Sequence, residues 1–181
     1  AYARSFEGFK GFSLSTSNAQ HGVNLLGAWK YIQVLLWGPE VAYAPNVAAN
    51  TIANYFYVAV PLLGIYLLSA IAPGLAVWQR FALVVSAILL IPQTSFDYKL
   101  AHLFLPFAAF VNADTNERDT RYYSIVFGLL LIPKHYFLIL EDISAAVVLN
   151  PLLLLMLSLP LVRKAYRGFS ERGFSGKTAP Q

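Results

Sequence analysis

The chain has 181 residues, of which 57% are hydrophobic and 12% are charged, and it contains no cysteine. The apolar share exceeds the roughly 45–50% of soluble domains, so the composition indicates an integral membrane protein. The lack of cysteine excludes disulfides, thiolate catalysis and cysteine-ligated metal sites. The formal net charge of +4 is small and concentrated towards one end, which favours an effect on membrane orientation over binding to nucleic acid.

Length limits the number of membrane spans. A helix rises 1.5 Å per residue and needs about 20 residues to cross ~30 Å of hydrocarbon, so the chain has room for about four or five spans. We therefore predict an all-α fold, a polytopic helical membrane protein with one additional amphipathic interfacial helix. The chain begins with Ala1 and not with methionine, and we expect a processed product or a part of a longer protein.

Residues 1–49 are predicted to form an extracytoplasmic loop that contains the amphipathic helix. Apolar residues recur at helical spacing over residues 23–37, and Gly38-Pro39 follows as a helix stop. At about 15 residues this helix is too short to span the membrane. Two roles stay open: an interfacial or partly re-entrant helix facing a substrate, with Trp29 and Trp37 as anchors, or a helix on the bundle surface without a ligand.

Residues 50–162 are predicted to form the transmembrane helical bundle. Its spans are expected at 50–72, 75–92, 122–140 and 143–162, with a shorter fifth at 96–112. Pro61 is expected to kink the first span, and Pro73-Gly74 predicts a tight turn between two antiparallel helices. The hydrophilic run at 112–121 is expected to be a loop. Glu141-Asp142 is expected to cap the last span.

Lysine and arginine counts predict the orientation. If the basic tail at 163–181 is cytoplasmic, alternation of the spans places eight of the thirteen Lys and Arg residues on that side: Arg80, Arg118, Arg121, Arg163, Lys164, Arg167, Arg172 and Lys177. This bias follows the positive-inside rule. We therefore predict a multi-pass protein of the cell inner membrane with a cytoplasmic C-terminus. Residues 1–49, 93–99 and 134–142 would then share the outer face.

A polar segment at residues 91–100, here called the polar knot, interrupts two apolar spans. Asp or Lys near hydrocarbon is costly, so such residues lie at an interface or line a wet cavity. Asp97, Tyr98 and Lys99 of the knot and Lys134 and His135 of a later span would meet at the outer face. They are the candidate residues for binding an anionic head group. The simpler alternatives are a solvated turn with Asp97 as a helix cap, lysines that snorkel separately, and an interior structural histidine.

Two motifs carry a family resemblance. Residues 92–100 (PQTSFDYKL) with Leu105-Pro106, and residues 131–136 (LIPKHY) one span later, resemble the C-terminal part of the glycosyltransferase family 87 membrane proteins. These are GT-C fold enzymes similar to the polyprenyl-phosphate-mannose-dependent mannosyltransferases. Residues 18–30 are similar to the preceding extracytoplasmic helix of that family. The resemblance covers about residues 15–160.

The resemblance implies sugar transfer, with inversion, from a polyprenyl-phosphate donor to an acceptor at the outer face. Such a reaction needs a carboxylate base and cations that hold the leaving phosphate. Lys99, Lys134 and His135 would supply the cationic part, and Asp97 would orient Lys99 or Tyr98. The family's catalytic aspartate lies in its first outer loop and has no match here, so the base stays unassigned. We expect this chain alone to be inactive, with lipids as ligands and with neither metal nor cofactor.

A second class of function stays open. The chain would then be a non-catalytic scaffold or accessory subunit of a larger membrane complex, which its modest length favours. A transporter fragment is a third interpretation, since broken helices with charges at membrane depth also suit substrate sites. The sequence has no internal repeat, so it favours the transporter least.

Overall fold

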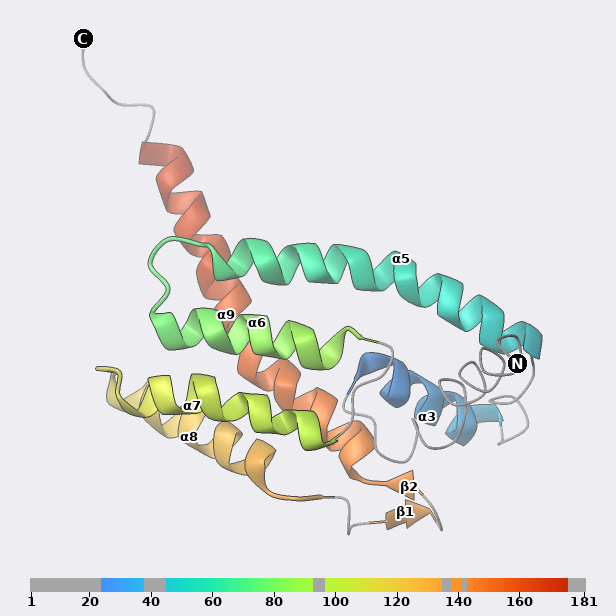
Figure 1. Ribbon diagram of the computed structural model, residues 1–181. Coiled ribbons are helices and arrows are strands. Elements are labelled where there is room, and N and C mark those ends of the chain that lie inside the picture. Colours follow the sequence, from blue (N-terminus) through green and yellow to red (C-terminus); the bar gives the residue numbers. More distant parts are fainter. Residues whose placement is uncertain (1–23, 38–44, 93–96, 135–137, 141–142, 176–181) are drawn as a thin grey trace, which may run out of the picture.

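The computed structural model describes residues 24–37, 45–92, 97–134, 138–140 and 143–175 (Figure 1). In chain order the elements are α3 (Leu25–Trp37), α5 (Pro45–Ala70), α6 (Val77–Leu90), the 3₁₀-helix η1 (Asp97–Leu103), α7 (Phe104–Val111), α8 (Glu117–Leu131), β1 (Leu138–Leu140), β2 (Ile143–Ser144) and α9 (Ala146–Ser175). The all-α prediction is confirmed apart from one short β-hairpin.

The helix α6 lies at the centre of the bundle. It contacts α5, α7, α9 and η1, and nine of its 14 residues are buried. A turn joins it to α5, and Figure 1 shows the two helices running antiparallel, as predicted. Gly74 in this turn has a φ of 81°, a left-handed conformation that favours glycine. The tight turn predicted from Pro73-Gly74 is therefore confirmed. Figure 1 also shows a bend in α5, which contains Pro61.

An aromatic cluster joins α6 to α7 and α8. The ring of Trp78 lies 5.0 Å from that of Phe110 and 4.8 Å from that of Tyr123, both edge-on. Phe127 continues the cluster at 5.6 Å from Phe110 and 5.5 Å from Phe107. Edge-to-face aromatic pairs add about 0.5–1.5 kcal/mol each beyond their buried area. This cluster therefore fixes the α7–α8 hairpin against the central helix.

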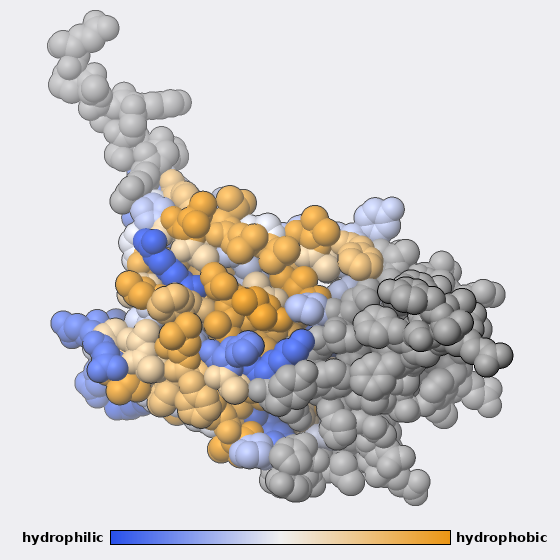
Figure 2. Space-filling view, viewed as in Figure 1, coloured by the Kyte–Doolittle hydropathy of each residue, from blue (hydrophilic) through white to orange (hydrophobic). Residues whose placement is uncertain are grey.

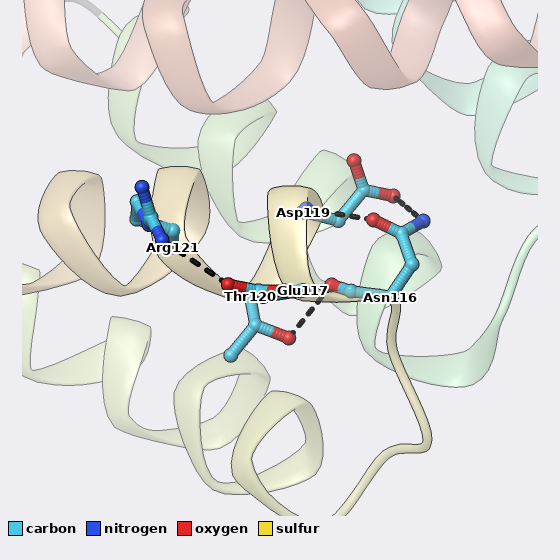
Figure 3. Close-up of polar contacts among 5 residues, drawn as sticks. All are labelled: Asn116, Glu117, Asp119, Thr120 and Arg121. Carbon is cyan, nitrogen blue, oxygen red and sulfur yellow. Dashed lines mark hydrogen bonds and ion pairs between the residues drawn. The ribbon is translucent and has the colours of Figure 1, made fainter.

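The start of α8 corrects the loop predicted at 112–121. The helix begins at Glu117, inside that run, because Asn116 acts as its N-cap (Figure 3): its side-chain Oδ1 accepts a hydrogen bond from the Asp119 backbone N–H at 2.8 Å. Glu117 and Asp119 lie in the first turn, where carboxylates complement the helix dipole. A cap residue followed by acidic residues is a helix-start signal, and the hydrophilic composition obscured it.

The end of α8 corrects the span predicted at 122–140. The helix ends at Leu131, and Ile132 has a ψ of 126°, the extended conformation that a residue before proline favours. Pro133 is therefore the stop signal. Farther on, β1 pairs antiparallel with β2, with Leu138 opposite Ser144. A short apolar run cannot be assigned to helix or strand from its composition alone, which is why the strand was missed.

The last helix extends beyond the span predicted at 143–162. In the structure α9 is one 30-residue helix that continues through the basic residues to Ser175. It begins at Ala146, three residues later than predicted, and the Ser144 hydroxyl accepts the Ala146 backbone N–H at 3.1 Å. Glu141 and Asp142, the predicted caps, lie outside the described residues.

Four other predicted helices are present with small shifts in their bounds. The amphipathic helix is α3, and the span predicted from residue 75 is α6. The span predicted from residue 50 begins five residues earlier, at Pro45, because proline is well tolerated in the first helical turn. The short fifth span begins as η1 at Asp97 and becomes α-helical at Phe104. This start at Asp97 is within one residue of the predicted start at residue 96.

The connecting segments gather at two opposite ends of the bundle (Figure 1). We call one the knot end: it holds the end of α6, the start of η1, the end of α8, the β-hairpin and the start of α9. We call the other the turn end: it holds the α5–α6 turn and the α7–α8 turn. The helices α5, α6, α7 and α8 therefore run in alternating directions between the two ends.

One helix among the described residues is long and apolar enough to cross a membrane by length and composition, Ala146–Glu171 within α9. Shorter apolar helices are Tyr55–Ala70, Val77–Leu90 and Lys99–Val111. Figure 2 shows apolar side chains over α5 and α6 and hydrophilic ones gathered towards the end of the α7–α8 hairpin.

Candidate functional site at the knot end

Two side chains, Tyr55 of α5 and Asn24 directly before α3, hold backbone carbonyls at and just after the end of α6. The Tyr55 hydroxyl, from α5, donates to the Ile91 carbonyl and, at 3.4 Å, to the Leu90 carbonyl. The Asn24 side-chain Nδ2 donates to the Pro92 carbonyl at 3.0 Å. The last carbonyls of a helix have no donor within it, so these bonds satisfy groups that are otherwise orphaned. They fix the position at which the polar knot begins.

Asn24 also organises α3. Its side-chain Oδ1 accepts the Gly27 backbone N–H at 2.6 Å, which makes Asn24 the N-cap of the helix, and the residue is fully buried. One side chain therefore starts α3 and attaches it to the knot. An Asn directly before a periodic apolar run is a cap signal in the sequence. The bond to Pro92 joins residues 68 positions apart and has no local signal.

Lys134 is turned back onto α8. Its side chain is only 8% exposed, and Nζ donates to the Leu130 carbonyl at 3.3 Å and to the Ile132 carbonyl at 3.0 Å. A cation there complements the negative end of the helix dipole. The Lys134 carbonyl in turn accepts the Ser144 hydroxyl at 3.1 Å, which links the end of α8 to the start of α9. Lys134 therefore has a structural role at the knot end.

The other predicted site residues are placed unequally. Lys99 is half-buried in η1, which contacts α8, so it belongs to an element adjacent to the one that Lys134 caps. Asp97 and Tyr98 are in the first turn of η1, but their side chains lie outside the described residues. His135 also lies outside them. The structure thus brings the η1 and α8 segments to one end, and a cavity shared by the five residues stays a prediction.

An apolar groove of about 330 Å³ lies between α5 and α6 on the knot side. Its lining consists of Tyr55, Phe56, Ala59, Val60, Leu63, Ala87, Ile88, Ile91 and Pro92. The volume is at the lower end of the range for small-molecule pockets. The groove ends at Tyr55, Ile91 and Pro92, the residues that fix the start of the polar knot. The groove therefore reaches the start of the polar knot.

The turn end has its own polar contacts. The Gln79 side-chain Oε1, buried in α6, accepts Lys164 Nζ at 3.2 Å, which ties α6 to α9. Arg80 donates to the Leu75 carbonyl at 3.3 Å and to the Ala72 carbonyl at 3.4 Å. Cations at this end therefore hold the α5–α6 turn together in addition to carrying charge.

Within the described residues, no group of three or more His, Cys, Asp or Glu side chains could hold a metal ion. No family model, curated protein or solved structure matches the chain. The resemblance to glycosyltransferase family 87 therefore rests on the motifs at residues 92–100 and 131–136.

Proposed function

We propose that the chain is a polytopic protein of the cell inner membrane, with the turn end in the cytoplasm. Large apolar side chains exposed on four helices support this placement: Phe56 and Leu67 on α5, Phe104 and Leu105 on α7, Ile125 and Leu129 on α8, and Leu152 and Leu159 on α9. Soluble monomers rarely expose apolar surface on this scale. The 14 residues of α6 rise only about 21 Å, but its neighbours enclose it, so it does not have to match the hydrocarbon by itself.

We further propose that the bundle is the lipid-binding part of a GT-C glycosyltransferase that takes a polyprenyl-phosphate-linked sugar at the outer face. The observation that carries this proposal is the α5–α6 groove, which is apolar along its length and ends at the polar knot. A prenyl chain has the same polarity, apolar with a phosphate at one end. The groove would hold part of the prenyl chain and present its phosphate to the polar knot.

Lys99 is the residue that we assign to the phosphate, because it follows the groove closely in sequence and lies in the knot itself. Lys134 adds positive potential from the end of α8, even though its ammonium group bonds to carbonyls. Asp97, Tyr98 and His135 complete the proposed set, with Asp97 orienting Lys99 or Tyr98. The catalytic base stays unassigned.

Binding of a short prenyl phosphate to the chain in lipid nanodiscs tests the proposal, with the matching prenyl alcohol as the reference ligand. Val60→Trp should fill the groove and weaken binding, whereas Val77→Trp is the control, because both valines are about equally exposed (66% and 65%) and only Val60 lines the groove. Lys99→Gln should remove a charge-assisted contact of about 1.5–3 kcal/mol, a ten- to hundredfold loss for the phosphate only. Equal affinities for phosphate and alcohol would contradict the proposal.

The contacts of Lys134 favour a second candidate, a non-catalytic scaffold or accessory subunit. The two bonds from Lys134 to carbonyls at the end of α8 stabilise the fold and need no ligand. In that case Lys134→Met should lower the thermal unfolding midpoint and leave prenyl-phosphate binding unchanged. Under the transferase proposal the same substitution should also weaken binding of the phosphate, because the positive potential at the knot falls.

A further inference from the structure

A second apolar groove, of about 390 Å³, lies between α5 and α9 at the turn end. It is lined by Ile65, Leu68 and Ser69 from the last turns of α5 and by Val162, Tyr166 and Phe169 from α9. All but Ser69 and Val162 are exposed. The groove is separate from the one at the knot end, and the proposed transferase does not use it.

Two arginines accompany this groove. Arg163 and Arg167 directly follow the lining residues Val162 and Tyr166 on α9, and both are exposed. They are four positions apart, so they project from the same side of the helix one turn apart. Within the described residues neither arginine forms an ion pair, the one found there being Arg121–Glu117 on α8. The exposed Glu171 lies one turn beyond Arg167. Arg163 and Arg167 thus carry positive charge beside the groove without lining it.

The length of the apolar part of α9 places these two arginines at a membrane boundary. The 17 residues from Ala146 to Val162 rise about 25 Å, close to the thickness of the hydrocarbon core. Arg163 therefore comes at the end of the apolar part, followed by Tyr166, a residue type enriched at membrane interfaces. A Cβ atom on Gly168 would lie 2.9 Å from the Pro73 carbonyl oxygen, so α9 is packed closely against the α5–α6 turn. Both walls of the groove are thereby held in place.

We propose that this groove binds an acyl chain of an anionic phospholipid whose phosphate pairs with Arg163 and Arg167. Guanidinium groups suit this ligand because their planar donors bind phosphate oxygens bidentately. A free phosphate has no use for the apolar groove, and a zwitterionic lipid carries its own compensating cation. Charge and polarity together therefore select an anionic lipid of the leaflet at the turn end. The proposal needs the membrane placement of the bundle but no transferase activity.

Native mass spectrometry of the full chain in detergent tests the proposal, with phosphatidylglycerol, phosphatidylcholine and inorganic phosphate as separate ligands. The double variant Arg163→Gln/Arg167→Gln should bind phosphatidylglycerol at least tenfold more weakly, while Arg163→Lys/Arg167→Lys, which keeps the charge, retains intermediate binding. Arg118→Gln/Arg121→Gln is the control, because it removes the same charge at the turn end away from the groove. Leu68→Trp, which fills the groove, should also weaken binding.

Four results would overturn the proposal: equal binding of phosphatidylglycerol and phosphatidylcholine, equal loss in the Arg118/Arg121 control, full binding by Leu68→Trp, or inorganic phosphate that displaces the lipid. Equal binding of the two lipids would indicate non-selective attraction, and equal loss in the Arg118/Arg121 control would indicate long-range attraction. Displacement by inorganic phosphate would indicate a free-anion site. Prenyl-phosphate binding is measured on the same variants and should be unchanged, since the α5–α6 groove is intact. If the wild type itself does not bind prenyl phosphate, the proposed transferase is contradicted, but the proposal of a phospholipid site is not.

Discussion

The contact between Tyr122 and α9 predicts a specific stability effect. Pro160 lies inside α9 and has no N–H, so it cannot donate to the Met156 carbonyl one turn earlier. The Tyr122 hydroxyl, from α8, donates to that carbonyl at 2.7 Å. One side chain therefore satisfies the group that the proline leaves without a helical partner.

Tyr122→Phe should lower the free energy of unfolding by about 1 kcal/mol. Interhelical hydrogen bonds in membrane proteins average about 0.6 kcal/mol, and an unsatisfied polar group costs about 1–3 kcal/mol. The Met156 side chain is 41% exposed, and in the proposed placement this surface faces lipid, where no water replaces the lost donor. The effect should therefore exceed the membrane average.

A double-mutant cycle with Pro160→Ala isolates the cause, measured by reversible unfolding in mixed micelles. Alanine restores the backbone donor at position 160, so Tyr122→Phe should cost much less in that background, with a coupling of about 0.5–1 kcal/mol. Tyr57→Phe is the control, because Tyr57 is strongly exposed and has no hydrogen bond within the described residues. An equal cost of Tyr122→Phe in both backgrounds would refute the reasoning.

Three further substitutions test the packing. Gly168→Ala should lower the free energy of unfolding by about 1–3 kcal/mol, because the added Cβ would lie 2.9 Å from a backbone carbonyl oxygen. Gly128→Ala is the control: its Cβ would meet nothing within 4 Å, so it should stabilise α8. Equal shifts of the thermal midpoint in the two variants would contradict this. Tyr66→Phe should cost about 0.5–1.5 kcal/mol by removing its 2.6 Å bond to Ser158, and full additivity with Ser158→Ala would count against that bond. Asn24→Ala should speed amide exchange in α3, and an equal change throughout α6 would show general loosening instead.

Local signals explain why most helices could be predicted. Apolar periodicity, Pro73-Gly74 and Gly38-Pro39 act over a few residues, and they located α3, α6 and the α5–α6 turn. The errors in α8 are local too, since the Asn116 cap and the Pro133 stop were both present in the sequence. The hydrophilic composition of residues 112–121 and the apolar run after Pro133 point the other way, so the predicted span at 122–140 differs from α8 by several residues at each end.

The candidate site depends on contacts that no local pattern encodes. Alternating spans predicted that the knot and Lys134 lie at one end, and the start of η1 and the end of α8 do lie at one end. The sequence did not indicate that Lys134 caps α8, because that requires the backbone path after Pro133. The roles of Asn24 and Tyr55 at the end of α6 and the groove beside them arise only when distant helices pack together.

Cysteine accessibility tests most directly whether the bundle crosses the membrane with its two ends on opposite sides. The native chain has no cysteine, so single substitutions report without background. Thr115→Cys, in the α7–α8 turn, and Ser170→Cys, on α9, should react with a membrane-impermeant maleimide only after the cells are permeabilised. Ile132→Cys, at the end of α8, should react in intact cells. Reaction of Thr115→Cys and Ile132→Cys from the same side would contradict the membrane placement on which both proposed sites depend.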